Sequence, residues 1–392
     1  MVAAGACVDC VPVSRARILC ISLSPIERDA RVLRQLSVLT EFGDVTTVGY
    51  GATPPGVTRH VRVPDDRLSL PQTPFGVLRL GLRAHRSVEL AAPGVAFAHR
   101  ALAGERFDLV VANDARVLAL AFELAGDAPV WADMHEWAPE ERTHVLAWKL
   151  LVAPFMVHLC RRYLPRAAAV TTVGGEIAKL YERDFGVRPE VMRNAAPFAD
   201  LEPTAVPDDR IRLVHSGGAV HGRNLELMID AVKRLDERFT LDLYLVPAAD
   251  GGKYLGELRA RADGDERIRF NDPVAPGDLP RTLNAYDVGV FWIPPVHTNA
   301  RLTLPNKLFD YVQARLAVAI GPTVEMVSVL EEHDLGVVAR DFTVEASAAS
   351  LETLTAADVA RYKANAHASA RALSFDHERD VARGILRRLL GA

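Results

Sequence analysis

The sequence predicts an α/β protein with two domains of similar architecture, each built on a parallel sheet with helices on both faces. The 392 residues exceed what one ordinary hydrophobic core accommodates. Short apolar runs of strand length alternate with amphipathic segments along nearly the whole chain, as in doubly wound sheets. The alternation breaks at 195–210, AAPFADLEPTAVPDDR, whose prolines and aspartates are typical of a linker.

The first half opens with an apolar strand at 16–24. A helix follows at 29–43, where apolar residues recur at helical spacing and Gly43 stands at the C-cap position. The same patterns predict strands at 44–50, 107–113, 128–135 and 167–174, and a helix at 175–186.

The alternation restarts after the linker. It predicts strands at 211–217, 239–247, 268–274, 287–294 and 317–321, and helices at 224–238, 278–286, 305–315 and 324–333. We therefore expect domains at 1–198 and 199–372, with an amphipathic terminal helix in 373–392 that can cross back to the first domain.

Composition excludes several classes of protein. The net charge of −4 and the scattered basic residues give no concentrated basic face for nucleic acid. Four cysteines in so long a chain do not make a disulfide framework, which favours a reducing compartment and a cytoplasmic location. Cys7 and Cys10 form a CxxC, but no second pair completes a metal site.

The most apolar segment is His144–Cys160. Lys149, Pro154 and His158 interrupt it, and it is shorter than the roughly 20 residues that span a bilayer, so we interpret it as a buried helix. The basic CRRYLPR that follows keeps a helix lying on a membrane surface as the alternative. The N-terminal stretch lacks the basic start and apolar run of a signal peptide.

Two polar clusters follow predicted strands of the second half. In the first, HSGGAVHGRNLELM, Gly217 and Gly218 let backbone N–H groups approach an anion, and Arg223 can contact phosphate oxygens. The alternative is a tight turn with a solvated arginine. No GxGxxG, GxxxxGK[ST], HExxH or GxSxG motif is present, so nicotinamide and P-loop enzymes have little support.

The second cluster is LTLPNKLFDY. Thr303 or Asn306 can cap the helix, and Pro305 suits its first turn. Lys307 and Asp310 share one helix face, either as an exposed ion pair or as a ligand site. In a ligand site, Lys307 would neutralise phosphate and Asp310 would accept hydrogen bonds from a hydroxyl pair such as a ribose.

These stretches carry a family resemblance. Five segments resemble segments of retaining GT-B glycosyltransferases of family 4, and they follow one another along the chain in the same order as in that family. In chain order they are SPIERDARVLRQLSVLTEFGDVTTVGYG, WADMHEWAPEE, TTVGGEIAKLYERDFGVRPEVMRNA, SGGAVHGRNLELMIDAV and LPNKLFDYVQARLAVAIG. The resemblance implies two Rossmann-like domains facing a cleft, with a nucleotide-diphosphate sugar held by the second domain.

The resemblance also assigns the donor site. It implies that Arg223 and Lys307 grip the diphosphate, where the family has lysine at the first position and a further arginine at Gly218. Asp310 replaces the ribose-binding glutamate. Leu302 stands where the family often has a sugar-binding glutamate, so sugar contact would come from Asn299 and from the backbone of Thr303, Leu304 and Asn306.

In the first domain, His135 matches the histidine that lies over the donor sugar, which makes His135, Arg223 and Lys307 the expected catalytic residues. Asp133 and Glu136 flank it as orienting carboxylates. We expect Arg28, Asp29, Arg31 and Glu136 on the acceptor side, although a plain helix N-terminus with Asp29 near its dipole explains the first three almost as well.

The expected activity is retaining transfer of a hexose to an acceptor hydroxyl, without metal or cofactor, in natural-product or cell-surface glycan synthesis. The alternatives are a nucleotide-sugar epimerase or hydrolase on the same fold, and a sugar-nucleotide-binding protein without catalysis. The nucleotide base, the donor sugar, the acceptor and the oligomeric state stay open, and membrane association is the less favoured alternative.

Overall fold

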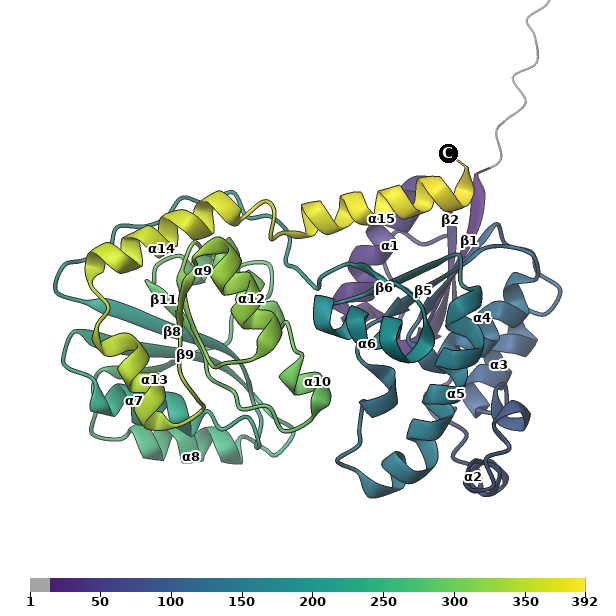
Figure 1. Cartoon of the computed structure of the whole chain (residues 1–392), viewed down its shortest axis with the longest axis horizontal. Helices are drawn as coiled ribbons and strands as arrows, with labels where there is room; N and C mark the ends of the chain where they lie inside the picture. Colours follow the sequence, from purple (N-terminus) through teal and green to yellow (C-terminus); the bar gives the residue numbers. More distant parts are fainter. Residues whose placement is uncertain (1–14, 392) are drawn as a thin grey trace, which may run out of the picture. The chain divides into compact units, whose positions relative to one another are not determined.

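The computed structural model describes residues 15–391. Cys7 and Cys10 therefore lie outside the described residues. Two parallel sheets organise the chain, one in each half (Figure 1). The α/β prediction is confirmed, and helices surround each sheet.

The first sheet has seven strands in the order β3-β2-β1-β4-β5-β6-β7. Ile18, Leu19, Cys20 and Ile21 are successive residues of β1, and none is exposed, which shows that both faces of the central strand are covered. The strands are β1 Ala16–Pro25, β2 Gly43–Tyr50, β3 Arg59–Arg62, β4 Leu109–Asn113, β5 Val130–Met134, β6 Ala169–Thr172 and β7 Glu190–Val191.

The helices of the first half begin with α1, Ala30–Phe42, which ends directly on β2. Gly43 is its C-cap, as predicted, but in extended rather than left-handed conformation. A Cβ there would lie 2.1 Å from the Ala16 carbonyl oxygen, so only glycine fits. The other α-helices are α2 Pro74–Gly81, α3 Pro93–Ala101, α4 Leu118–Ala125, α5 Ala153–Tyr163 and α6 Gly175–Phe185, and short 3-10 turns occupy Ile26–Arg28, His85–Val88, Ala115–Val117, Ala138–Glu140 and Leu164–Arg166.

The second sheet has six strands in the order β10-β9-β8-β11-β12-β13. Starting from β8, this order repeats that of the first sheet starting from β1. The strands are β8 Ile211–Ala219, β9 Phe239–Pro247, β10 Ile268–Asn271, β11 Val288–Phe291, β12 Ala317–Ile320 and β13 Gly336–Val338.

Alternate residues of these strands belong to two separate cores. Val288, Val290 and Ala319 pack with α7, α8 and α13, while Phe291 and Val318 pack with α9, α11, α12 and α14 on the other face. These helices are α7 Glu226–Arg234, α8 Lys253–Ala262, α9 Leu279–Leu283, α10 Thr298–Arg301, α11 Asn306–Gln313, α12 Val324–His333, α13 Val344–Glu352, α14 Ala356–Ser369 and α15 Phe375–Leu390.

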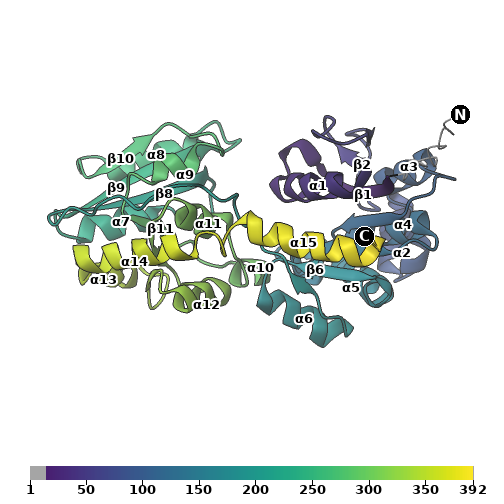
Figure 2. The same ribbon diagram turned by 90° about the horizontal axis from the view of Figure 1, so that it is seen from above.

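The chain forms two compact units. One comprises the chain up to Asp133, Arg162–Ala169 and the residues from Arg383 on, and the other comprises Met134–Arg161 and Val170–Ala382. Figure 2 shows α15 in yellow as a continuous helix. The division at 198 and 372 stays a prediction.

The apolar segment His144–Cys160 forms a π-helical turn, Trp148–Val152, that continues into α5. Phe155, Met156 and Leu159 are buried, as expected of a core helix, but Val145, Leu146 and Leu150 are exposed. Within residues 15–391, none of the helices has both the length and the apolar character needed to cross a bilayer.

Candidate functional site

Ligands of doubly wound sheets bind at the carboxyl ends of the strands, where the strand order reverses. In the second sheet this switch point lies between β8 and β11, which pair in parallel. The end of β8 and the segment after β11 are therefore the places to look for a site, and both predicted polar clusters belong to these segments.

The glycine-rich turn after β8 contains two residues with positive φ and holds Arg223 beside its glycines. Gly217 and Gly218 directly precede Ala219, the last residue of β8, and the Arg223 guanidinium lies near them, with Nη1 3.5 Å from the Gly218 carbonyl oxygen. Gly222 has a φ of +89°, which favours glycine, and Asn224 has a φ of +51°. Arg223 itself is exposed, so its charge is available to a ligand.

Lys307 and Asp310 lie in α11 and form an ion pair of 2.9 Å between Nζ and Oδ2. Their side chains are 24% and 14% exposed. The predicted helix cap is wrong: Pro305 is the N-cap residue, and neither Thr303 nor Asn306 caps the helix with its side chain. The first N–H groups of α11 thus lack a side-chain acceptor from the cap position.

His215 is a residue of this site that the sequence reasoning missed. It is fully buried in β8, and its Nδ1 donates to the Val290 carbonyl oxygen at 2.9 Å. Burial, together with the charges of Lys307 and Arg223, lowers the pKa of His215 to about 4. Both cations are therefore close to this imidazole, which joins the two predicted clusters into one constellation, the β8–α11 site.

The neutral imidazole has a defined tautomer in this setting. A carbonyl oxygen only accepts, so Nδ1 carries the proton and Nε2 is left as an acceptor. A Cβ built on Gly217 would lie 3.3 Å from Nε2, so the acceptor lone pair faces the glycine turn. His215 could have been recognised in the sequence as a histidine at the end of an apolar strand, directly before Ser216 and the glycines.

Ser216 supplies a second missed feature. Its side chain is 3% exposed, and its Oγ is among the buried polar atoms of residues 15–391 that have no hydrogen-bond partner. A buried hydroxyl of this kind is costly unless a ligand or water satisfies it. Ser216 follows His215 in β8, so its side chain points to the opposite face of the sheet.

The segment between β11 and α11 contains the predicted sugar-contacting residues. Asn299 is 7% exposed, and its Oδ1 accepts from the Trp137 backbone N–H at 2.8 Å. Its Nδ2 donates to Glu136 Oε2 at 3.1 Å. Leu304 packs into the core, so only its backbone is offered to a ligand, and Leu302 is the half-buried C-cap residue of α10. The structure thus brings Asn299 and Glu136 together, and their ligand roles stay predictions.

The residues of the first sheet that were predicted to face the acceptor substrate lie in different environments. Arg31 is 6% exposed and forms two hydrogen bonds with Asp133, Nε to Oδ2 at 2.9 Å and Nη2 to Oδ1 at 2.6 Å. Gln35 donates to the same carboxylate at 3.3 Å. Arg31 is therefore committed to a buried ion pair, and Asp133 orients Arg31.

Arg28 and Asp29 precede α1 and do not meet Arg31 at that ion pair. The Asp29 carboxylate caps α1 by accepting from the Val32 N–H at 3.2 Å, and it accepts from Ser24 Oγ at 2.9 Å. The structure thus shows the helix N-terminus that was the alternative interpretation. The Arg28 side chain is 86% exposed. His135 follows β5 directly and is half-buried.

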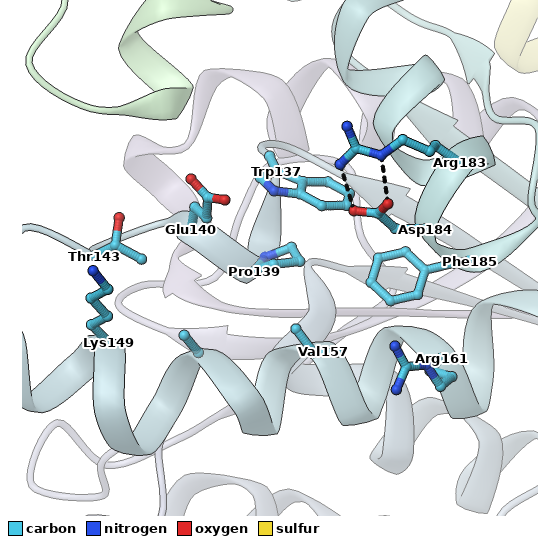
Figure 3. A pocket seen from close by; sticks show the side chains of 11 residues that line it. Trp137, Pro139, Glu140, Thr143, Lys149, Val157, Arg161, Arg183, Asp184 and Phe185 are labelled. Atoms are coloured by element: carbon cyan, nitrogen blue, oxygen red, sulfur yellow. Dashed lines mark hydrogen bonds and ion pairs between the residues drawn. The ribbon is translucent and has the colours of Figure 1, made fainter.

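A pocket of about 650 Å³ lies along α5 and the π-helical turn before it (Figure 3). Lys149, Ala153, Val157 and Arg161 line one wall at intervals of four residues, so they form a single stripe on the helix. The opposite wall has an aromatic and charged lining of Trp137, Pro139, Glu140, Thr143, Arg183, Asp184 and Phe185.

The charges in this pocket are only partly paired. Arg183 and Asp184 neutralise each other through hydrogen bonds of 2.6 and 2.8 Å, drawn as dashed lines in Figure 3. Lys149 and Arg161 are exposed and have no ion pair with any described residue. The pocket therefore has cations at both ends of an apolar stripe, and no sequence motif indicated it.

No three His, Cys, Asp or Glu side chains within residues 15–391 are grouped so as to hold a metal ion. The two cysteines in this range, Cys20 and Cys160, are buried thiols rather than a disulfide. Burial raises the pKa of Cys20 to about 12, so this thiol stays protonated and chemically inert.

Comparisons with known proteins agree with the fold. The Glycosyltransferase Family 4 model matches residues 52–202. No curated protein matches the chain in sequence. Among solved structures, HepE from Anabaena in complex with UDP-glucose is 16% identical, with 95% of this chain and 100% of that chain covered and a TM-score of 0.68.

Two further structures match over similar lengths. Sucrose-phosphate synthase from Thermosynechococcus elongatus is 14% identical, covers 96% of this chain and 100% of its own, and has a TM-score of 0.69. Trehalose 6-phosphate synthase from Burkholderia multivorans is 13% identical, covers 97% and 99%, and has a TM-score of 0.64. The chain thus has the GT-B fold, and residues 52–202 are similar to Glycosyltransferase Family 4.

Proposed function

We propose that the protein is a retaining, metal-independent glycosyltransferase that moves a hexosyl group from a nucleotide-diphosphate sugar to an acceptor hydroxyl. The observation that carries the proposal is the β8–α11 site. It combines the glycine turn, the Arg223 and Lys307 charges and the His215 imidazole at the switch point of the second sheet.

The cations suit a diphosphate better than a neutral ligand. Arg223 is held over Gly217 and Gly218, where backbone N–H groups and a guanidinium can share phosphate oxygens. Lys307 adds a second charge from α11. Together they would stabilise the negative charge that develops on the departing nucleotide, and this contribution needs no metal ion.

Asp310 has a different task in this proposal. Its carboxylate already holds Lys307 at 2.9 Å and keeps a further oxygen for a hydroxyl pair, such as that of a ribose. His215 Nε2 supplies a neutral acceptor beside the cations. The family match over 52–202 supports transfer chemistry, and the UDP-glucose bound to HepE supports a uridine nucleotide as the first donor to test.

In the proposed reaction, the acceptor oxygen bonds to the anomeric carbon as the bond from that carbon to the diphosphate breaks. The acceptor proton passes to a phosphate oxygen of the departing nucleotide. Attack on the face that the nucleotide leaves preserves the anomeric configuration. The chain's own residues bind the diphosphate and orient the sugar.

Calorimetric titration with UDP and UDP-glucose tests the donor site. Arg223→Ala and Lys307→Ala should each weaken the Kd by about tenfold or more, because each removes a charge-assisted contact. Arg281→Ala and Lys253→Ala remove exposed charges elsewhere and serve as matched controls. Wild-type affinity in both site variants would exclude this diphosphate assignment.

Turnover measurements test the retention of configuration and the independence from metal. Product analysis by NMR should show the anomeric configuration of the donor, and a chelator should leave the rate unchanged. Release of free sugar or of an epimer without any acceptor would favour the hydrolase or epimerase instead. Binding without any turnover would indicate a non-catalytic protein.

A further inference from the structure

A second hollow lies beside the pocket along α5 and differs from it in charge. It has a volume of about 360 Å³, and two segments of one compact unit, 143–149 and 295–301, line it. Its lining residues are Thr143, His144, Lys149, Pro295, Val296, His297, Thr298 and Arg301. Four of them are basic and none is acidic, although the net charge of the protein is −4. We call this hollow the basic pocket.

The two permanent cations of the basic pocket are available to a ligand. Lys149 and Arg301 are exposed, and neither forms an ion pair with another residue of 15–391. Arg301 is instead positioned by a neutral group, because its Nη2 donates to Thr298 Oγ1 at 3.3 Å. An exposed cation of this kind contributes little to the stability of the fold.

Two carboxylates are near the pocket in the sequence, and neither neutralises these cations. Glu141 pairs with Arg142 at 3.7 Å. Glu140 Oε2 accepts from Thr298 Oγ1, and the Glu140 side chain lines the pocket along α5 rather than the basic pocket. The basic pocket therefore keeps its positive charge.

One histidine adds a hydrogen-bond donor of defined position. His297 is the N-cap residue of α10, and its Nδ1 accepts from the Ala300 N–H at 3.2 Å. The neutral ring thus carries its proton on Nε2, which donates to no other residue of 15–391. His144 stacks against His297, with ring centroids 5.8 Å apart. Burial and then His144 lower the pKa of His297, and no carboxylate raises it.

The place of the basic pocket connects it with the proposed transfer reaction. Arg301 directly precedes the segment 302–306, which includes the backbone groups predicted to contact the donor sugar. Thr143 and Lys149, labelled in Figure 3, also line the pocket along α5. The two hollows are therefore contiguous and leave room for a ligand much larger than one anion.

We propose that the basic pocket binds a phosphate group on the acceptor substrate. Lys149 and Arg301 would make charge-assisted hydrogen bonds with the phosphate, and His297 Nε2 would add a neutral donor. A phosphate matches this set because it is anionic and offers several strong acceptor oxygens. The body of the acceptor would extend into the pocket along α5. The word acceptor rests on the proposed function, whereas phosphate binding does not.

Calorimetric titration of the full chain with inorganic phosphate, in excess UDP, tests the proposal. UDP fills the β8–α11 site, so the phosphate binding that is left reports the basic pocket. K149Q/R301Q should weaken the Kd for phosphate by about tenfold or more, because it removes both charges. H297N should weaken it by about fivefold, since asparagine can keep the α10 cap but lacks the Nε2 donor. R281Q/K253Q removes exposed charges elsewhere and should bind like wild type.

Two further probes identify the body that carries the phosphate. Glucose 6-phosphate and dihexanoyl phosphatidic acid present the same group on a sugar and on a lipid. One of them should bind more tightly than inorganic phosphate, and K149Q/R301Q should weaken that binding too. Glucose, which has no phosphate, should not bind. Thermal unfolding checks that every variant is folded.

Three results would overturn the proposal. The first is that phosphate does not bind in excess UDP, or binds K149Q/R301Q as it binds wild type. The second is that K149Q/R301Q weakens UDP as strongly as phosphate, because the pocket then belongs to the donor. The third is that neither organic phosphate binds more tightly than inorganic phosphate, which leaves an adventitious ion only. If UDP itself does not bind, the proposed function fails alone, and R223A/K307A then isolates phosphate binding at the basic pocket without UDP.

Discussion

The two sheets have the same strand order around β1 and β8, but their carboxyl ends use charge in opposite ways. At the first sheet, Arg31 and Asp133 are 6% and 0% exposed and pair through two hydrogen bonds. At the second, Arg223 is exposed, and its guanidinium Nη1 lies 3.5 Å from the Gly218 carbonyl oxygen. The first end pairs its buried charges with each other, whereas the second leaves the Arg223 charge available to a ligand.

This difference distinguishes a charge that stabilises the fold from a charge that is available to a ligand, and it does so without comparison with any related protein. A buried and fully paired guanidinium stabilises the fold and has little left to offer a substrate. An exposed guanidinium over a glycine turn does little for stability and is available to an anion. Each of the following variants tests one side of the contrast.

The largest expected effect is on stability, at the first sheet. Arg31→Met leaves the Asp133 carboxylate buried without its main partner, so we expect the free energy of unfolding to fall by about 3–5 kcal/mol. Urea unfolding measures this. Arg28→Met, at a side chain that is 86% exposed, should change it by less than about 0.5 kcal/mol. Normal stability with lost acceptor binding in Arg31→Met would restore Arg31 to the acceptor site.

The second largest expected effect is a dependence of the free energy of unfolding on pH, and it comes from His215. Its pKa is lowered from 6.5 to about 4 by burial, so the unfolded chain takes up the proton first as pH falls. Stability that is fully present above pH 6.5 is therefore lost progressively down to about pH 4, by about 3 kcal/mol. Unfolding curves of wild type and His215→Gln across this window should differ in slope. Equal slopes would show that His215 is accessible to protons in the folded state.

A smaller effect is expected on donor binding at Asp310. Asp310→Ala removes the carboxylate that holds Lys307 and would meet the ribose, which should cost about 2 kcal/mol in donor affinity. Asp310→Glu keeps the charge and should bind nearly as well as wild type. Calorimetry with UDP compares the three proteins. An equal loss in both variants would mean that the length of the side chain, rather than its charge, governs the site.

The smallest effect concerns Asp29. Asp29→Ala removes the cap of α1, so stability should fall by about 1 kcal/mol while the Kd for UDP stays at its wild-type value. Asp29→Asn can keep the capping hydrogen bond and should recover most of the loss. Thermal unfolding and calorimetry on the same samples separate the two readouts. Reduced acceptor use in Asp29→Asn would favour the acceptor role over the cap.

Much of the fold was predictable because its signals are local. Strand β9 coincides with the predicted 239–247, and α12 coincides with 324–333. Each is a run of fixed periodicity with a clear end. The stretch 51–106 gave no prediction and contains β3, α2 and α3. Helix α2 is apolar on both its packed and its exposed faces, so it lacks the polar–apolar alternation by which sequence reasoning recognises a surface helix.

The candidate site was predictable only in part, for a physical reason. Arg223, Lys307 and Asp310 belong to motifs, and the motifs predicted their involvement. His215 and Ser216 depend on a tertiary property, namely burial beside a strand end, that no local pattern encodes. Pairing across the chain was equally invisible: Arg31 and Asp133 are 102 residues apart. Sequence reasoning therefore assigned Arg31 by its position in a motif, while the structure shows what it contacts.

The π-helical turn Trp148–Val152 has a consequence for how the pocket along α5 tolerates change in length. Such a turn is the form that one additional residue takes inside an α-helix. Loss of one residue from this turn would therefore convert it into an ordinary α-helical turn and leave the flanking residues in nearly the same rotational phase. Lys149 would keep its place in the stripe with Ala153, Val157 and Arg161. Loss of a residue between Val157 and Arg161, in the regular part of α5, would instead rotate Arg161 by about 100° relative to Val157. The turn is thus the part of this wall where a change in length leaves a cation at both ends.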